Sequence, residues 1–227
     1  MLHSSFFVLS QIFFFSIHIF QTHFAKQFNS FDFCSFIHAL VTTVTSHYVL
    51  WKHPSKIKNI FDISDVPMDS YAKTFFTYVP IFSMAYGVYD IFTGLLQKRW
   101  DFFLHGCIML LIIFSCYVQD SAHIVMLPLT TEISTIFLAF RNWNSILLNS
   151  CFALTFFLYR LVLLPLVSFY MIGKVCLNSV IASTLSIGQG TLNSLNGMWG
   201  YKIFKLFKAL FTKPTPVLLL EYIKIIE

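Results

Sequence analysis

Ionisable side chains lie inside several long apolar stretches of this sequence, and they are the residues best suited to chemistry. The deepest are His38, His47, Asp90, His105, Glu132 and Arg160. A charge inside a membrane costs several kcal/mol, so each of these residues is a candidate for a functional site. Tyr86 and Asp90 are four residues apart and would share one helical face, as would Asp101 and His105. A histidine beside a carboxylate can act as a general base.

Arg160 lies in the middle of the apolar stretch FFLYRLVLLP, too deep for its side chain to reach water easily. It therefore needs a carboxylate, and Asp90 and Glu132 are the two at a similar depth. Such a pair could simply hold helices together, or it could line a cavity that binds a substrate or a lipid headgroup. We expect at least three of Asp90, His105, Glu132 and Arg160 to converge on one inward-facing cluster.

Standard catalytic signatures are missing from the sequence. It contains no P-loop, no HExxH and no GxSxG motif, and GQGTLNSLNG at 188–197 lacks the strand that a dinucleotide fingerprint needs. The histidines are not spaced as a metal site within any one helix. Any chemistry must therefore be assembled across helices, and we expect no metal and no other cofactor. The five cysteines form no CxxC pair and are expected to be reduced packing residues.

The composition of the chain indicates that these residues are positioned by membrane-spanning helices. Of 227 residues, 57% are hydrophobic and only 11% are charged, whereas soluble domains have about 25% charged residues. Phenylalanine alone accounts for 28 residues. These values exclude a soluble globule, a disordered chain, a coiled coil and a nucleic-acid-binding protein. The predicted fold class is all-α, a multi-pass transmembrane helical bundle.

About seven spans are expected, because a bilayer core needs roughly 17–25 helical residues. The last is the least apolar, since one face carries Asn178, Ser183 and Gln189. It either packs this polar face into the bundle or lies along the interface. The predicted spans are Leu2–Phe20, Phe33–Trp51, Thr74–Leu96, Phe102–Val118, Ala122–Phe140, Ser145–Ile172 and Val175–Tyr201.

Three regions follow from these spans. Residues 1–29 form an N-terminal transmembrane helix, residues 30–210 a six-helix transmembrane domain, and residues 211–227 a basic cytoplasmic tail. Residues 52–73 are the one long connection. The stretch KIFKLFKALFTK, at 202–213, is either an amphipathic helix that attracts anionic lipid or a simple stop-transfer flank.

Four stretches resemble the TLC-domain family, which includes ceramide synthases, the translocon-associated TRAM proteins and the ceroid-lipofuscinosis ER protein. Over roughly residues 30–210 they follow the family's order: MAYGVYDIFTGL (84–95), RWDFFLHGCIML (99–110), TTEISTIFLAFRNW (130–143) and LNGMWGYKIFK (195–205). The third is the most specific. The resemblance implies an all-helical bundle, residence in the endoplasmic reticulum or a related membrane, and a role connected with lipids.

The sequence also departs from the family's pattern. Gly106 stands where the family has the second histidine of a pair, Ile136 replaces a proline, and Ala139 replaces an asparagine. The His-Asp pair of the ceramide-synthase signature has no counterpart, because the corresponding region reads Thr131-Glu132. An acyltransferase needs a positioned base and an assisting group. These departures argue against ceramide synthesis by the standard mechanism.

The leading functional hypothesis is a membrane protein of lipid homeostasis that binds an acyl chain or a headgroup within its bundle. One alternative is a lipid acyltransferase with His105 as base and Glu132 or Asp90 as orienting acid. The other is an ER cargo receptor or a structural membrane protein. Expected partners are membrane lipids, with acyl-CoA and a sphingolipid as the candidates, and no nucleic acid. The expected location is the endoplasmic reticulum, with the plasma membrane as the alternative.

The sequence also gives candidate site residues. The catalytic candidates are His105 and Glu132. The substrate-binding candidates are Asp90, Tyr86, Arg160, Thr135 and His38.

Lysine and arginine predict the orientation. With seven spans, the side that carries the tail holds the larger share of these residues, which puts the tail in the cytoplasm and the N-terminus in the lumen. A cysteine introduced at Lys213 should therefore react with a membrane-impermeant maleimide from the cytoplasmic side. Labelling from the lumenal side would contradict both the orientation and the number of spans.

Overall fold

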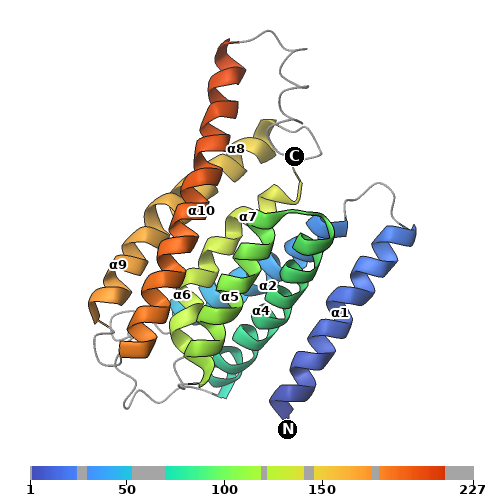
Figure 1. Ribbon diagram of the computed structural model, residues 1–227, viewed down its shortest axis with the longest axis vertical. Helices are drawn as coiled ribbons and strands as arrows, with labels where there is room; N and C mark the ends of the chain where they lie inside the picture. The colour runs from blue at the N-terminus through green and yellow to red at the C-terminus, as the bar shows by residue number, and fades with distance from the viewer. Residues whose placement is uncertain are drawn as a thin grey trace.

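The computed structural model describes residues 2–24, 30–52, 70–118, 122–140, 146–174 and 179–212. Within these ranges the chain forms helices joined by short turns and contains no strand, so the predicted all-α bundle is confirmed (Figure 1). Most of the long connection at 52–73 lies outside the described residues. So do Arg141, Cys176 and the tail beyond Thr212. The four described cysteines, at 34, 107, 116 and 151, are free thiols.

Five helical segments are long and apolar enough to cross a membrane. They are α1 (Leu2–Phe24), α2 (Ser30–Lys52), α4 (Ser70–Leu96), α5 (Trp100–Val118) and a fifth built from α8 (Ile146–Thr155), η4 (Phe156–Leu163) and α9 (Leu164–Lys174). Large apolar side chains such as Leu9 and Phe169 are exposed on their outer faces. These segments lie within a few residues of five of the seven predicted spans.

The predicted span Ala122–Phe140 is not one regular helix. It consists of the 3₁₀ turn η1 (Ala122–Val125), α6 (Met126–Leu129), the 3₁₀ turn η2 (Thr130–Glu132) and α7 (Ile133–Leu138). Pro128 has no N–H to donate. The hydroxyls of Thr130 and Ser134 bond to the carbonyls of Leu127 and Thr131, at 2.6 and 3.1 Å, and so compete with regular helical bonding.

The last helix, α10 (Ser179–Thr212), buries part of its predicted polar face in the bundle, because Gln189 is buried whereas Ser183 is exposed. Gln189 and Asn196 are buried, while Ile187 on another face is exposed. The helix continues past Tyr201, where the predicted span ends, and through the predicted domain boundary at residue 210. In Figure 1 it lies beside α9 and extends beyond the rest of the bundle.

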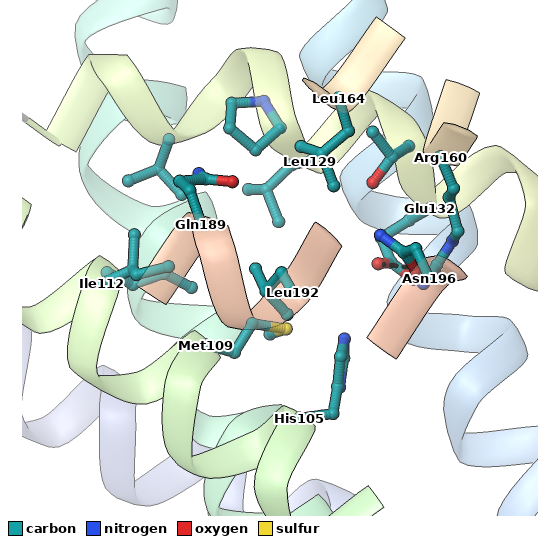
Figure 2. Close-up of a pocket in the computed structure, with 14 residues that line it drawn as sticks. His105, Met109, Ile112, Leu129, Glu132, Arg160, Leu164, Gln189, Leu192 and Asn196 are labelled. Atoms are coloured by element: carbon teal, nitrogen blue, oxygen red, sulfur yellow. Dashed lines mark hydrogen bonds and ion pairs between the residues drawn. The ribbon is translucent and has the colours of Figure 1, made fainter. Parts of the chain in front are cut away.

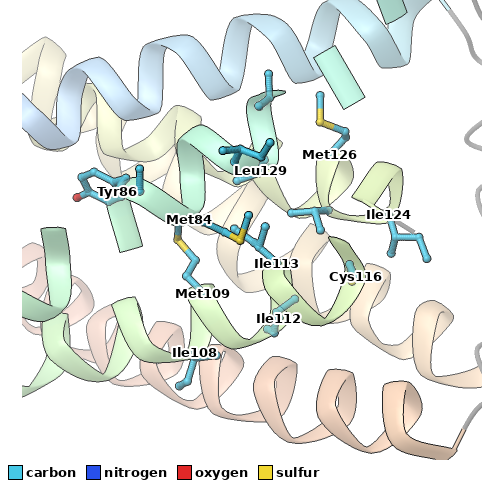
Figure 3. Close-up of a cluster of buried hydrophobic side chains, with 14 of the residues drawn as sticks. Met84, Tyr86, Ile108, Met109, Ile112, Ile113, Cys116, Ile124, Met126 and Leu129 are labelled. Carbon is cyan, nitrogen blue, oxygen red and sulfur yellow. The ribbon is translucent and has the colours of Figure 1, made fainter. Parts of the chain in front are cut away.

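Helices α4 and α5 form a tightly packed antiparallel hairpin at the centre of the bundle. A methyl group added to Gly106 would lie 2.6 Å from the carbonyl oxygen of Gly87 and 2.9 Å from Cβ of Asp90. The two backbones therefore approach as closely as glycine allows. Beyond this contact, an apolar cluster joins the hairpin to the 122–140 segment (Figure 3). Its members include Met84, Met109, Ile113, Met126 and Leu129.

The Gly106→Ala substitution should destabilise the protein by about 1–3 kcal/mol, because the added methyl forces α4 and α5 apart. Thermal unfolding of the purified chain in detergent measures the effect. Gly190→Ala in α10 is the matched control, since its added methyl would meet nothing within 4 Å. The control should unfold at the same temperature or slightly higher. Equal unfolding temperatures for the two variants would show that the close approach carries no energetic weight.

Candidate functional site

A small cavity inside the bundle brings together the ionisable residues expected to converge. His105, Glu132 and Arg160 line it (Figure 2). Asp90 does not line it but contacts His105. The cavity has a volume of about 40 Å³, enough for two or three water molecules. Most of the remaining wall is apolar, with Met109, Ile112, Ile113, Val125, Leu129, Leu164 and Leu192.

The first polar pair is formed by Asp90 of α4 and His105 of α5. The Asp90 carboxylate Oδ2 lies 3.2 Å from Nδ1 of His105, and only 1% of Asp90 is exposed. The carboxylate holds the imidazole in one orientation and favours the tautomer with its proton on Nδ1. No hydrogen bond to Nε2 occurs among the described residues, and the ring points toward Glu132 and Asn196 (Figure 2). An imidazole held in this way can accept a proton from a group in the cavity.

The second polar pair is formed by Glu132 of η2 and Arg160 of η4. A guanidinium nitrogen of Arg160 lies 3.0 Å from Oε1 of Glu132. Of the two carboxylates that could have paired with Arg160, the structure selects Glu132. Thr135 bridges the pair, because its hydroxyl lies 2.7 Å from both Oε2 of Glu132 and the same guanidinium nitrogen.

The guanidinium of Arg160 is further occupied by neutral groups. Its Nε donates to the hydroxyl of Ser134 at 2.8 Å, and its Nη1 lies 3.5 Å from the amide oxygen of Asn196 on α10. The cation is therefore surrounded by one carboxylate and three uncharged acceptors. Because Glu132 and Arg160 cancel in charge, this end of the cavity presents no unbalanced positive charge to a ligand.

Several predicted binding residues lie behind the cavity rather than in its wall. The ring of His38 is fully buried and stacks on Tyr86, with centroids 4.0 Å apart, and its Nε2 lies 3.2 Å from the hydroxyl of Ser83. The Tyr86 hydroxyl bonds to Ser35 at 2.8 Å. These contacts join α2 to α4. Like Asp90 and Thr135, His38 and Tyr86 are placed to support the lining, and their roles as ligand-binding residues stay predictions.

Asp101 does not pair with His105, although the two share a helical face. Its carboxylate bonds to Arg99 at 3.3 Å and accepts a hydrogen bond from the Trp199 indole at 3.3 Å. The Trp199 ring lies 6.0 Å from the His105 ring. Asp101 thus fixes an aromatic side chain of α10 beside the imidazole.

Two lining residues of α10, Gln189 and Asn196, were not among the predicted site residues. The sequence indicated a polar face on this helix, but not which of its residues would turn toward the charged pairs. Asn196 does lie within LNGMWGYKIFK, the fourth family-like stretch. This stretch was the one feature of the sequence that could have indicated Asn196 as a site residue.

Comparison with known proteins gives one family match. A family model described as the TLC domain matches residues 28–205, a range that includes every residue lining the cavity. No curated protein and no solved structure matches the chain.

The Glu132→Gln substitution should lower the stability of the protein by about 3–5 kcal/mol, because Arg160 is left buried without a counter-charge. The double variant Glu132→Gln with Arg160→Met should recover most of the lost abundance. Asp101→Asn is the control, since its pair with Arg99 is partly exposed and contributes at most about 1 kcal/mol. Quantitative immunoblotting and thermal unfolding measure both effects. Normal abundance of the single variant would show that the pair is not structural.

Proposed function

The chain belongs to the TLC-domain family, and from this premise we propose that it binds a membrane lipid in the cavity between α5, η2, η4 and α10. It is an integral membrane protein, and we propose that it takes part in lipid homeostasis in the endoplasmic reticulum. The observation that carries the proposal is the cavity itself. Charged side chains gather at one end of a space whose other walls are mostly apolar and which lies inside a bundle of apolar helices.

The lining suits a molecule that has a polar group attached to a hydrocarbon chain. Met109 and Leu192 offer hydrocarbon contacts beside the polar end of the cavity. The cavity as it stands holds two or three water molecules, so a lipid enters only if side chains move to widen it. Met109 can do so, because methionine has an unbranched, adaptable side chain. The polar group of the lipid would meet His105, whose Nε2 side lacks a hydrogen bond among the described residues.

The charge balance of the site favours an uncharged polar group over a phosphate. Arg160 is the cation that could bind a phosphate, and it is already paired with Glu132 at 3.0 Å. A second anion would have to break that pair or lie unpaired in a medium of low dielectric constant. A hydroxyl, an amine or an amide can meet the imidazole without this cost.

A second candidate function, acyl transfer, is favoured by the Asp90–His105 contact. A carboxylate that orients a histidine, with the other ring nitrogen directed into a cavity, is the arrangement of a general base. His105 would take the proton from a lipid hydroxyl or amine as it attacks the carbonyl carbon of an acyl thioester such as acyl-CoA. The C–S bond then breaks, and the departing thiolate takes the proton back from His105 and leaves as the free thiol. Asp90 is better placed than Glu132 to orient the base, because Glu132 is engaged with Arg160.

The His105→Asn substitution should reduce the lipid retained by the purified protein about tenfold, the size expected for the loss of one buried hydrogen bond. Asparagine keeps a donor for Asp90, so abundance should hold. His47→Asn is the control, because His47 contacts Thr43 and Tyr159 and does not line the cavity. Mass spectrometry of lipid retained in detergent measures binding, and incubation with acyl-CoA and a long-chain amine or alcohol measures turnover.

The outcomes separate the two functions. Lipid retention that depends on His105, without turnover, supports binding alone. Turnover that is lost in both His105→Asn and Asp90→Asn supports acyl transfer. Lipid retention that is unchanged in His105→Asn would contradict the proposed site.

A further inference from the structure

A second polar position lies in the same cavity, away from the charged pairs. Gln189 of α10 lines the cavity and is only 1% exposed. It precedes Asn196 by seven residues on the same helical face, so the two are about 10 Å apart along the helix axis. Figure 2 shows their side chains at opposite ends of the cavity, with Leu192 and Met109 between them.

The hydrogen bonds of this amide are incomplete. Its Oε1 lies 3.0 Å from the hydroxyl of Ser168 on α9, and Nε2 has no partner among the described residues. The Ser168 hydroxyl carries one hydrogen, and the Leu164 carbonyl at 2.6 Å competes for it. If the amide is turned over, Nε2 donates to Ser168 and Oε1 is left without a partner. In either orientation one amide atom needs another bond.

The unpaired amide atom of Gln189 lies in apolar surroundings. The cavity wall near Gln189 is formed by apolar side chains such as Ile112 and Leu129. A buried polar group without a partner is destabilising, and native proteins seldom retain one. A leucine would fill the position without that cost. The amide is explained if a molecule that enters the cavity completes its hydrogen bonds.

We infer that Gln189, supported by Ser168, binds a hydroxyl group carried on the hydrocarbon chain of the lipid, about two helical turns from the polar group at His105. This inference rests on the proposed function. A hydroxyl both donates and accepts, so it pairs with the amide in either orientation, whereas a carbonyl or an ether only accepts. The charged side chains of the lining, Glu132 and Arg160, belong to the opposite end, so an uncharged group suits this one.

The test uses two probes that differ only at the position of the hydrocarbon chain that Gln189 would contact. One is 1-octadecanol, whose hydroxyl can donate to Nε2 of His105, and the other is 1-octadecanol with a second hydroxyl group near the middle of the chain. Binding of each to the full chain in lipid nanodiscs is measured by competition against the lipid that it retains. The wild-type protein should prefer the hydroxylated probe about tenfold.

Gln189→Met keeps the length of the side chain and removes its hydrogen bonds, so it should abolish the preference while still binding 1-octadecanol. Gln189→Leu is a second variant, with thermal unfolding measured for both. Asn193→Leu is the matched control, because Asn193 lies on the same helix but does not line the cavity. This control should keep the preference.

Three results would overturn the inference. If the wild-type protein binds both probes equally, the Gln189 amide does not bind the hydroxyl group of the chain, although the proposed lipid site is not contradicted. If the preference survives in Gln189→Met, another residue is responsible. If neither probe displaces the retained lipid from wild type, the proposed function fails, and this inference fails with it.

Discussion

Every charged side chain buried in this bundle has to meet a partner, because a low-dielectric interior penalises an unpaired charge far more than water does. Arg160 sets the strictest demand, since its guanidinium carries five N–H donors that all need acceptors. It is met by Glu132 at 3.0 Å and by the hydroxyls of Thr135 and Ser134. These contacts fix how the segment 122–140 sits against η4. The cavity lies where these elements meet α5 and α10.

The backbone deviates from regular helix at the residues that carry this pair. Glu132 ends a 3₁₀ turn, and Arg160 lies within the π-helix η4. A 3₁₀ turn tightens a helix and a π-helix widens it, and both types of irregularity are common at functional sites. Each deviation weakens regular hydrogen bonding. The ion pair and its hydroxyl contacts offset that loss, which explains why an apolar segment of this length is interrupted inside the bundle.

Composition and hydropathy were enough to predict the fold class and most spans, because burial in a membrane demands long apolar helices. The convergence of His105, Glu132 and Arg160 was also predictable, because ionisable side chains inside a membrane are stabilised when they pair with one another. The choice of Glu132 over Asp90 as partner of Arg160 was not, because it depends on the rotation of each helix. The same rotation decides that Gln189 and Asn196 line the cavity while other polar residues of α10 do not. The helix propensities of the residues did not predict the interruptions of the helix near Pro128 and Thr130.

Gly106 connects the packing of the bundle to its chemistry. The resembled family pattern has a second histidine at this position, yet here a single added methyl group would lie 2.6 Å from the Gly87 carbonyl oxygen. With this packing of α4 against α5, no larger side chain has room. The close approach brings Asp90 to 3.2 Å from His105. The glycine therefore allows the packing in which one histidine is held by a carboxylate. The two polar pairs then have separate roles, because Arg160 and Glu132 satisfy each other while His105 keeps one ring nitrogen for the cavity.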